Sequence, residues 1–206
     1  MNTNLGGGNV KLPGLFAAEG KLASVVPLRM EHHDDLVEAA RDGELYRLWY
    51  TRVPQPEDMR SEIQRRLGLQ EGGSVMPFAI VDKDNGKAVG MTTYMNIDAA
   101  NRRLEIGATW YRQSAQRSPL NTECKRLLLQ NAFEQLNCIS VEFRTHFMNF
   151  QSRRAIERLG AKLDGVLRSN MLMSNGTVRD TAVYSIIASE WPAVKANLNW
   201  QLEKPR

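Results

Sequence analysis

The stretch Asn149-Phe-Gln-Ser-Arg-Arg-Ala-Ile-Glu-Arg-Leu-Gly-Ala161 is the most informative part of this sequence. It follows an alternating run, Val141-Glu-Phe-Arg-Thr145, which predicts a strand. An apolar stripe at helical spacing comes next, formed by Ala155, Ile156 and Leu159. Gly160 is expected to end the helix because glycine readily adopts the left-handed backbone conformation, and a further strand-like run begins after it. The pattern predicts a short helix that begins directly after one strand and ends directly before another.

The polar face of this helix carries Arg153, Arg154 and Arg158 beside Ser152. Free N–H groups at a helix start, together with arginines, suit a ligand rich in phosphate. The same residues also fit an ordinary surface helix with Asn149 as its N-cap and solvated arginines. The stretch alone leaves both interpretations open.

Length and composition limit the possible classes of protein. The chain has 206 residues, enough for one substantial core, and its 42% hydrophobic and 24% charged residues are ordinary for a globular protein. The two cysteines, Cys124 and Cys138, have neither a disulfide pattern nor a metal-ligand spacing. We therefore expect a reducing, cytoplasmic location and no bound metal.

The N-terminus and the charge exclude other classes. No apolar run is long enough to span a bilayer, and the N-terminus lacks the pattern of a secretory signal. We expect residues 1–20 to be a loose leader before one domain, 21–206. The net charge of +4, from 27 basic and 23 acidic residues, is too small for a nucleic-acid-binding surface. Neither a membrane nor a nucleic acid is expected as a partner.

Periodicity and turn signals predict a mixed order of elements. The expected strands are 22–28, 75–82, 88–97, 102–111, 139–145, 162–173 and 177–187, and the expected helices are 33–40, 56–69, 119–136, 150–159 and 189–199. Asn85-Gly86 and Asn175-Gly176 are strong hairpin signals. The order indicates a single α+β domain with a mixed, mostly antiparallel sheet flanked by helices.

The start of the helix at 119–136 is a second candidate anion site. Ser118 is a plausible N-cap, and Pro119 then occupies the first helical position, where its fixed φ is favourable. The groups expected to donate to a pyrophosphate there are the backbone N–H groups of Leu120, Asn121 and Thr122 and the side chains of Gln116 and Arg117. The simpler alternative is a helix that packs on a sheet with no ligand.

Four segments together resemble a known family: Leu104-Glu-Ile-Gly-Ala-Thr-Trp110, Gln116-Arg-Ser-Pro-Leu-Asn-Thr-Glu123, residues 149–161, and Gly176-Thr-Val-Arg-Asp-Thr-Ala-Val-Tyr-Ser-Ile186. The chain resembles the GNAT superfamily of acyl-coenzyme A-dependent N-acetyltransferases over roughly residues 22–191. The closer resemblance is to the RimJ/RimL-like branch, which acetylates protein N-termini and other primary amines.

The resemblance implies an acetyl-CoA site. In this family two neighbouring strands splay apart, and the pantetheine arm pairs with backbone in the gap. Here Thr109, Trp110 and Tyr111 would supply that backbone, near a bulge that Gly107 could permit. The pyrophosphate loop maps onto residues 116–121, which include Ser118. Asn149 would bind a pantetheine amide, and Arg154 is the candidate cation on the same helix.

The sequence departs from the family pattern in the pyrophosphate loop. Pro119 stands at the first glycine and Asn121 at the second small residue. The proline removes one N–H donor, worth about 0.5–1.5 kcal/mol. We expect weakened or rearranged binding, with the Asn121 amide as a substitute donor. The alternative is a non-catalytic protein of the same fold that binds a nucleotide-like ligand or a protein partner.

Acetyl transfer to an amine also needs a proton acceptor and a donor for the departing thiolate. Glu105 is the candidate base because it lies on the strand beside the proposed acyl site; the alternative is an outward-facing glutamate paired with Arg102 or a residue near Arg103. Ser152 is the candidate hydroxyl near the thiolate, since Ile156 occupies the place of the family's tyrosine. Alternatively, Ser152 only satisfies the helix start.

Other polar residues give weaker signals. His146 is a second candidate base or a solvated strand-end histidine, and Arg179 with Asp180 resembles a structural ion pair. The aromatic residues that could line an amine pocket, or simply pack, are Tyr46, Trp49 and Tyr50. The sequence leaves open whether the acceptor is a protein N-terminus or a small-molecule amine, and edge strands make a homodimer possible.

Overall fold

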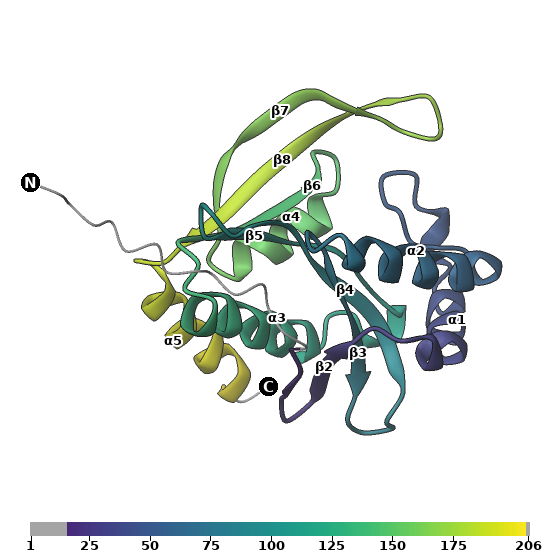
Figure 1. The fold of residues 1–206 in the computed structure, drawn as a ribbon, viewed down its shortest axis with the longest axis horizontal. Coiled ribbons are helices and arrows are strands. Elements are labelled where there is room, and N and C mark those ends of the chain that lie inside the picture. The colour runs from purple at the N-terminus through teal and green to yellow at the C-terminus, as the bar shows by residue number, and fades with distance from the viewer. Residues whose placement is uncertain (1–15, 205–206) are drawn as a thin grey trace, which may run out of the picture.

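The computed structural model describes residues 16–204 and contains one eight-stranded sheet in the order β1-β2-β3-β4-β5-β6-β8-β7 (Figure 1). The strands are β1 (Ala18–Glu19), β2 (Ala23–Pro27), β3 (Met76–Asp82), β4 (Ala88–Asp98), β5 (Arg103–Tyr111), β6 (Ser140–His146), β7 (Lys162–Leu172) and β8 (Val178–Ile187). Every neighbouring pair is antiparallel except β5 and β6, which are parallel. The predicted mixed, mostly antiparallel sheet is confirmed.

Helices cover the two faces of the sheet at different places. Helices α1 (His33–Arg41) and α2 (Met59–Glu71) pack on β3 and β4, where they form the smaller of two buried clusters. The opposite face carries α3 (Leu120–Gln130), α4 (Phe150–Arg158) and α5 (Trp191–Glu203), which enclose the larger cluster (Figure 1). Within the described residues, each helix is too short or too polar to cross a bilayer.

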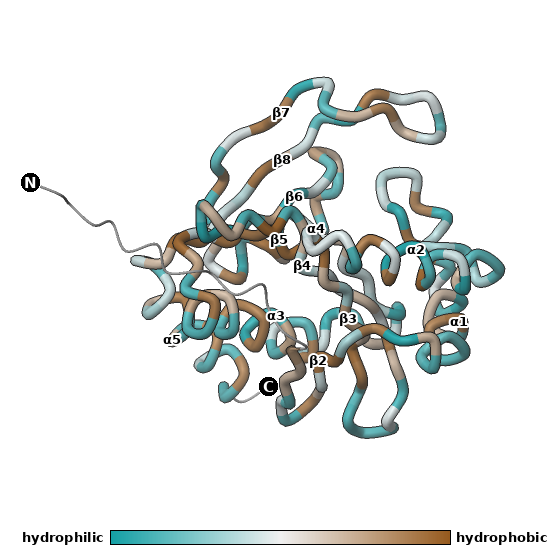
Figure 2. The backbone as a smooth tube through the Cα atoms, viewed as in Figure 1, coloured by the Kyte–Doolittle hydropathy of each residue, from teal (hydrophilic) through white to brown (hydrophobic). Residues whose placement is uncertain are grey.

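The central strands owe their position to alternating hydrophobic side chains. On β5, Leu104 and Ile106 point into the larger cluster, so Glu105 and Gly107 face the side of α1 and α2. Figure 2 shows hydrophobic residues concentrated along the central strands, whereas the turn between β3 and β4 and much of α2 are hydrophilic. The alternation thus places one carboxylate, that of Glu105, within an otherwise apolar strand.

Strands β5 and β6 diverge in the middle of the sheet. Their pairing runs only from Arg103 opposite Ser140 to Glu105 opposite Glu142. Beyond that point β5 continues to Tyr111 and β6 to His146 without pairing to each other. The expected splay between two middle strands is therefore present, and Glu105 lies where it begins.

A bulge in β5 accompanies this divergence. Gly107 pairs with Thr93 and Trp110 with Met91, so two residues of β5 stand against one of β4. The bulge was expected at a glycine, but the left-handed backbone belongs to Ala108, with φ of 48°. A Cβ at Gly107 would lie 2.7 Å from an oxygen of Glu105, so a larger residue there would displace the Glu105 carboxylate.

The start of α3 differs by one residue from the expected position. The helix begins at Leu120, and Pro119 is its N-cap because the Pro119 carbonyl accepts the first helical bond, from the N–H of Glu123 at 3.0 Å. Ser118 precedes the cap, and its hydroxyl accepts the N–H of Leu120 at 3.3 Å. The Leu120 N–H, expected to be free, therefore already has a protein acceptor. A π-helical turn, Asn131–Gln135, continues the helix to nearly its expected end.

The N-terminal region is joined to the domain through α3. Residues 1–15 of the expected leader lie outside the described residues, and β1 lies in the remainder. The buried carboxylate of Glu123 accepts the backbone N–H groups of Lys21, Leu22 and Ala23 at 2.8, 2.7 and 2.9 Å. One side chain thereby provides the hydrogen-bond acceptor for three backbone N–H groups between β1 and the start of β2.

Replacing Glu123 with Gln should lower the free energy of unfolding by about 1.5–3 kcal/mol, the range for a hydrogen bond to a charged group. The amide oxygen can still accept two N–H groups, but the NH₂ end would face the third. Denaturant unfolding of this variant and of Glu71→Gln, an exposed matched control on α2, measures the effect. Equal stability of the two variants would contradict the structural role.

Candidate active site

The two predicted helix starts lie next to each other. Gln151 of α4 donates to the side chain of Gln116, in the loop before α3, at 3.1 Å. Arg158 at the end of α4 donates to the Thr122 hydroxyl in the first turn of α3 at 2.9 Å. The start of α4 and the loop that leads into α3, far apart in sequence, therefore meet on one face of the sheet, whereas Arg158 lies at the C-terminal end of α4, which does not favour an anion.

Asn149 is the N-cap of α4. Its side-chain oxygen accepts the N–H of Ser152 at 3.0 Å, which is the structural role considered for it. The side-chain NH₂ makes no hydrogen bond within the described residues, so capping leaves a donor for a ligand. Ser152 is half-buried in the first turn, whereas Arg154 is exposed.

The loop before α3 and the first turn of α3 contain several unsatisfied groups. Arg117 is exposed and has left-handed backbone, with φ of 60°. The N–H groups of Asn121 and Thr122 precede the first helical bond, and no acceptor for them lies among residues 16–204. The side-chain oxygen of Asn121 is buried and lacks a partner in the same part of the chain. Because side-chain amide oxygen and nitrogen can exchange places, this end of Asn121 can also present a donor.

The predicted pantetheine-binding residues lie on the part of β5 that is paired with β4 but not with β6. Thr109 belongs to the bulge, Trp110 and Tyr111 follow it, and all three come after the last pairing with β6. The Tyr111 carbonyl accepts a bond from the Gln116 side chain at 3.1 Å, which joins the strand to the loop before α3. The divergence of the strands thus leads from Glu105 toward the helix starts.

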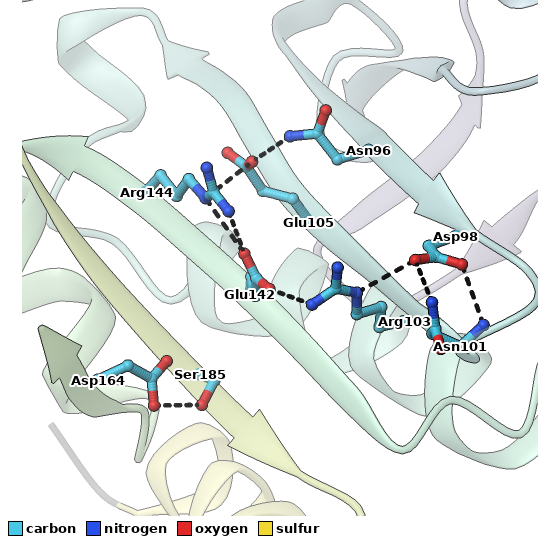
Figure 3. A network of polar contacts seen from close by, with 9 residues as sticks. All are labelled: Asn96, Asp98, Asn101, Arg103, Glu105, Glu142, Arg144, Asp164 and Ser185. Atoms are coloured by element: carbon cyan, nitrogen blue, oxygen red, sulfur yellow. Dashed lines mark hydrogen bonds and ion pairs between the residues drawn. The ribbon is translucent and has the colours of Figure 1, made fainter. Parts of the chain in front are cut away.

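Glu105 is buried, with 5% of its surface exposed. Asn96 donates to its carboxylate at 2.7 Å, and the Arg144 guanidinium lies 3.6 Å away (Figure 3). Burial raises the pKa of Glu105, although Asn96 and Arg144 oppose this effect. A carboxylate with a raised pKa is better matched to proton transfer near neutral pH than an exposed one.

The alternative interpretation of Glu105 is correct in expecting a cross-strand arginine but wrong about which one and about an outward-facing side chain. Arg103 lies near Asp98 and Glu142, and the cation beside Glu105 is Arg144 of β6 (Figure 3). Arg144 itself binds Glu142 at 2.8 Å. Glu105 is therefore the buried member of a polar network whose other charged members are half-buried or exposed.

Two buried cations that sequence reasoning missed hold the bulge from opposite faces. Arg66 of α2 pairs with Glu62 at 2.7 Å and donates to the Ala108 carbonyl at 3.3 Å. From the other face, Lys125 of α3 donates to the Thr109 hydroxyl at 2.8 Å. The Glu62–Arg66 spacing of four residues was a visible signal for the first pair. The sequence had no comparable signal for Lys125.

Lys125 is an unusual lysine because it is buried without an acidic partner. Its ammonium contacts the hydroxyls of Thr92 and Thr109 at 3.3 and 2.8 Å, and 5% of the residue is exposed. Burial lowers the pKa of Lys125 to about 7. The amine beneath the bulge can therefore gain or lose a proton near neutral pH.

The strand-end histidine is buried and not solvated. His146 is 4% exposed and lies edge-on against Trp49, with ring centroids 5.1 Å apart. Its Nδ1 accepts the N–H of Met148 at 3.0 Å, and its buried Nε2 has no partner within the described residues. Burial lowers the pKa of His146, which favours the neutral ring.

The expected pair of Arg179 with Asp180 is wrong. Asp180 instead binds Arg168 at 2.6 Å and the N–H of Ser169 at 2.7 Å. Neighbouring residues on a strand point to opposite faces, which separates Arg179 from Asp180. No group of three metal-ligating side chains is found in the part of the chain that the structure describes.

Comparison with known families agrees with this arrangement. Residues 24–162 match the family described as the acetyltransferase (GNAT) domain, which covers more than half of the chain. The chain belongs to the GNAT acetyltransferase family. The diverging strand pair beside the start of α4 agrees with the strand splay that the resemblance implied.

Individual relatives support the same assignment of this GNAT protein. YdaF of Bacillus subtilis, provisionally named a ribosomal N-acetyltransferase, is 32% identical over 111 residues, 54% of this chain and 60% of YdaF. A GCN5-related N-acetyltransferase from Brucella melitensis is 31% identical with a TM-score of 0.81, covering 91% of this chain and 86% of that one. RimL, a ribosomal L7/L12 α-N-protein acetyltransferase, shares the fold at 16% identity with a TM-score of 0.72, covering 85% of this chain and 96% of RimL. The name of YdaF is consistent with the resemblance to the RimJ/RimL-like branch.

The buried amine leads to a stability prediction. Between the folded pKa of Lys125 near 7 and an unfolded value of about 10.4, the unfolded chain binds one more proton, so rising pH stabilises the folded protein. Lys125→Met removes this dependence. The variant should be more stable than the unmodified protein at pH 6, and the difference should shrink by about 1.4 kcal/mol per pH unit between pH 7 and 9.

Denaturant unfolding at several pH values measures both proteins. Lys21→Met, at an exposed position, serves as the control and should show no such slope. A difference between Lys125→Met and the unmodified protein that stays constant from pH 6 to 9 would rule out a neutralised lysine.

Proposed function

We propose that this GNAT protein transfers the acetyl group of acetyl-CoA to a primary amine by direct attack in a ternary complex. The observation that carries the proposal is the buried carboxylate of Glu105 at the point where β5 and β6 diverge. The two helix starts lie on the other face of the same divergence. A protein N-terminus and a small-molecule amine are both acceptable acceptors.

The described residues suit the phosphates of coenzyme A. The free N–H groups of Asn121 and Thr122 lie at the positive end of α3, and the buried, unpartnered side-chain amide of Asn121 adds a polar group. The other proposed contributors are the loop residues Gln116, Arg117 and Ser118, the backbone of Leu120, and Arg154 of α4. The N–H of Leu120 is a weaker candidate because it already bonds Ser118.

The proposed reaction requires one proton to leave the amine and one to reach sulfur. Glu105 accepts the proton of the amine, directly or through a water, as the nitrogen bonds to the acetyl carbon. The carbon–sulfur bond then breaks, and the Ser152 hydroxyl donates a hydrogen bond to the departing thiolate of coenzyme A. The proton held by Glu105 passes to solvent, and the thiolate takes up a proton from solvent. A free backbone N–H in the Thr109–Tyr111 section of β5 stabilises the oxyanion. In this proposal the base and the hydroxyl act from opposite faces of the sheet.

Coenzyme A release from acetyl-CoA with a panel of N-terminal peptides, amino acids, polyamines and aminoglycosides tests the proposal. Calorimetry with coenzyme A measures cofactor binding separately. We expect binding, and turnover with at least one class of amine. Absence of both would contradict acetyl transfer and favour the non-catalytic alternative.

Glu105→Gln should reduce kcat by about 10²-fold or more while coenzyme A binding stays nearly unchanged. Because the base acts when deprotonated, kcat/KM of the unmodified protein should fall as pH decreases through the raised pKa of Glu105. The variant should lose this acid limb. Glu142→Gln, which alters the neighbouring carboxylate of the same network, is the control and should keep most activity. Equal loss in both variants would assign Glu105 a structural role.

Asn121→Ala should weaken coenzyme A binding by about tenfold to a hundredfold, the loss of one hydrogen bond to a charged ligand. Calorimetric titration of the variant and of Asn175→Ala, a control in the β7–β8 turn, gives the comparison. The melting temperature of the Asn121→Ala variant should stay close to that of the unmodified protein, since the Asn121 side-chain oxygen has no partner to lose among the described residues. Unchanged affinity would remove Asn121 from the phosphate site.

A further inference from the structure

Arg52 and Arg179, here called the arginine pair, come together from distant parts of the chain. Arg52 lies between α1 and α2, and its guanidinium contacts the sulfur of Met171 on β7 at 3.5 Å. Met171 is directly opposite Arg179 on β8. Figure 1 shows the loop between α1 and α2 and the β7–β8 hairpin extending toward each other. The contact brings two cations to the same side of the hairpin.

The arginine pair lies on the same face of the sheet as Glu105. Glu105 is paired with Glu142 of β6, and His146 follows four residues later on the same side of that strand. His146 is opposite Thr181 of β8, whose hydroxyl accepts a bond from Arg179 at 3.0 Å. Glu105, the proposed acceptor of the amine's proton, and the arginine pair therefore belong to one surface.

Neither arginine has a carboxylate within ion-pair distance in residues 16–204. Residues 1–15 contain no Asp or Glu that could supply one. By contrast, Arg144 on the same face binds Glu142, and Arg168 on the hairpin binds Asp180. Among the described residues, the arginine pair thus lacks an ion-paired carboxylate, although the charge of Glu105 acts on Arg179 from a longer distance.

Burial and the neighbouring Arg52 lower the pKa of the half-buried Arg179, although the charge of Glu105 opposes this effect. Two like charges brought together without an ion-paired carboxylate are unfavourable, and an anionic ligand relieves both the repulsion and the incomplete solvation. His146 adds a further unsatisfied group nearby, its buried Nε2. Guanidinium groups bind carboxylates and phosphates through paired, charge-assisted hydrogen bonds.

We propose that the acceptor amine carries a carboxylate or a phosphate on the same molecule. Arg52 and Arg179 bind this anionic group while Glu105 accepts the proton of the amine. The inference rests on the proposed acetyl transfer and restricts its substrate class. Polyamines and aminoglycosides, which bring only further positive charge to the arginine pair, are poor acceptors.

Three matched pairs of acceptors test this restriction and separate the possible sources of the anion: 6-aminohexanoate against 1,6-diaminohexane, an aminoalkyl phosphate against the matching amino alcohol, and Ser-Glu-Glu against Ser-Lys-Lys. In at least one pair the anionic member should have a kcat/KM about tenfold to a hundredfold higher, the effect of one charge-assisted contact. Arg179→Gln and the exposed Arg52→Gln should each raise KM for the anionic member, with kcat and coenzyme A affinity nearly unchanged.

Arg168→Gln is the control because Arg168 lies on the same hairpin but is already paired with Asp180. It should leave the preference intact. Hexanoate titrated into the protein saturated with coenzyme A gives a reading that does not depend on turnover. The unmodified protein should bind hexanoate more tightly than hexylamine, and Arg52→Gln should lose the difference.

Equal rates with the two members of every pair, or a preference that survives both arginine substitutions, would overturn the inference and leave acetyl transfer standing. If no acceptor is turned over, absence of hexanoate binding overturns the inference, and the coenzyme A titration then decides the proposed function separately. Hexanoate binding that depends on Arg52 and Arg179 supports the inference in either case.

Discussion

The bulge at Ala108 and Thr109 of β5 is the constraint on which the rest of the structure depends. It lies on the part of β5 that no longer pairs with β6, and it is held by buried cations from both faces. Arg66 binds the Ala108 carbonyl from the side of α2, and Lys125 binds the Thr109 hydroxyl from the side of α3. Because each cation belongs to a different helix, the position of the bulge is coupled to the packing of both layers.

Buried cations are unfavourable unless their hydrogen bonds are satisfied. Arg66 meets this condition with Glu62, whereas Lys125 has only two threonine hydroxyls and is close to losing its proton at neutral pH. Unequal compensation of this kind is common at functional sites, where groups with shifted pKa values gather. Glu105, on the other face of the same strand, is a second such group.

The proposed acceptor side differs in charge from the proposed cofactor side. The helix starts offer backbone N–H groups and surface arginines, which favour phosphate without requiring a particular shape. The face with Glu105 instead combines one buried carboxylate with an arginine pair that has no ion-paired carboxylate among the described residues. This difference is consistent with a family in which the fold fixes the position of the acyl donor and variable loops select the acceptor.

The sequence by itself determined the order of the elements from β2 onward, the start of α4 and the position of Glu105 on a strand, because these follow from local periodicity, capping and turn chemistry. Local rules could not place the α3 boundary, which depends on whether Ser118 or Pro119 provides the first helical acceptor. Only the tertiary structure decided the partners of charged residues: Asp180 binds Arg168 and not its neighbour, and Lys125 meets Thr92 and Thr109 across the sheet. The physical reason is that charge pairing depends on distance in space, to which strand register and helix packing contribute more than separation along the chain.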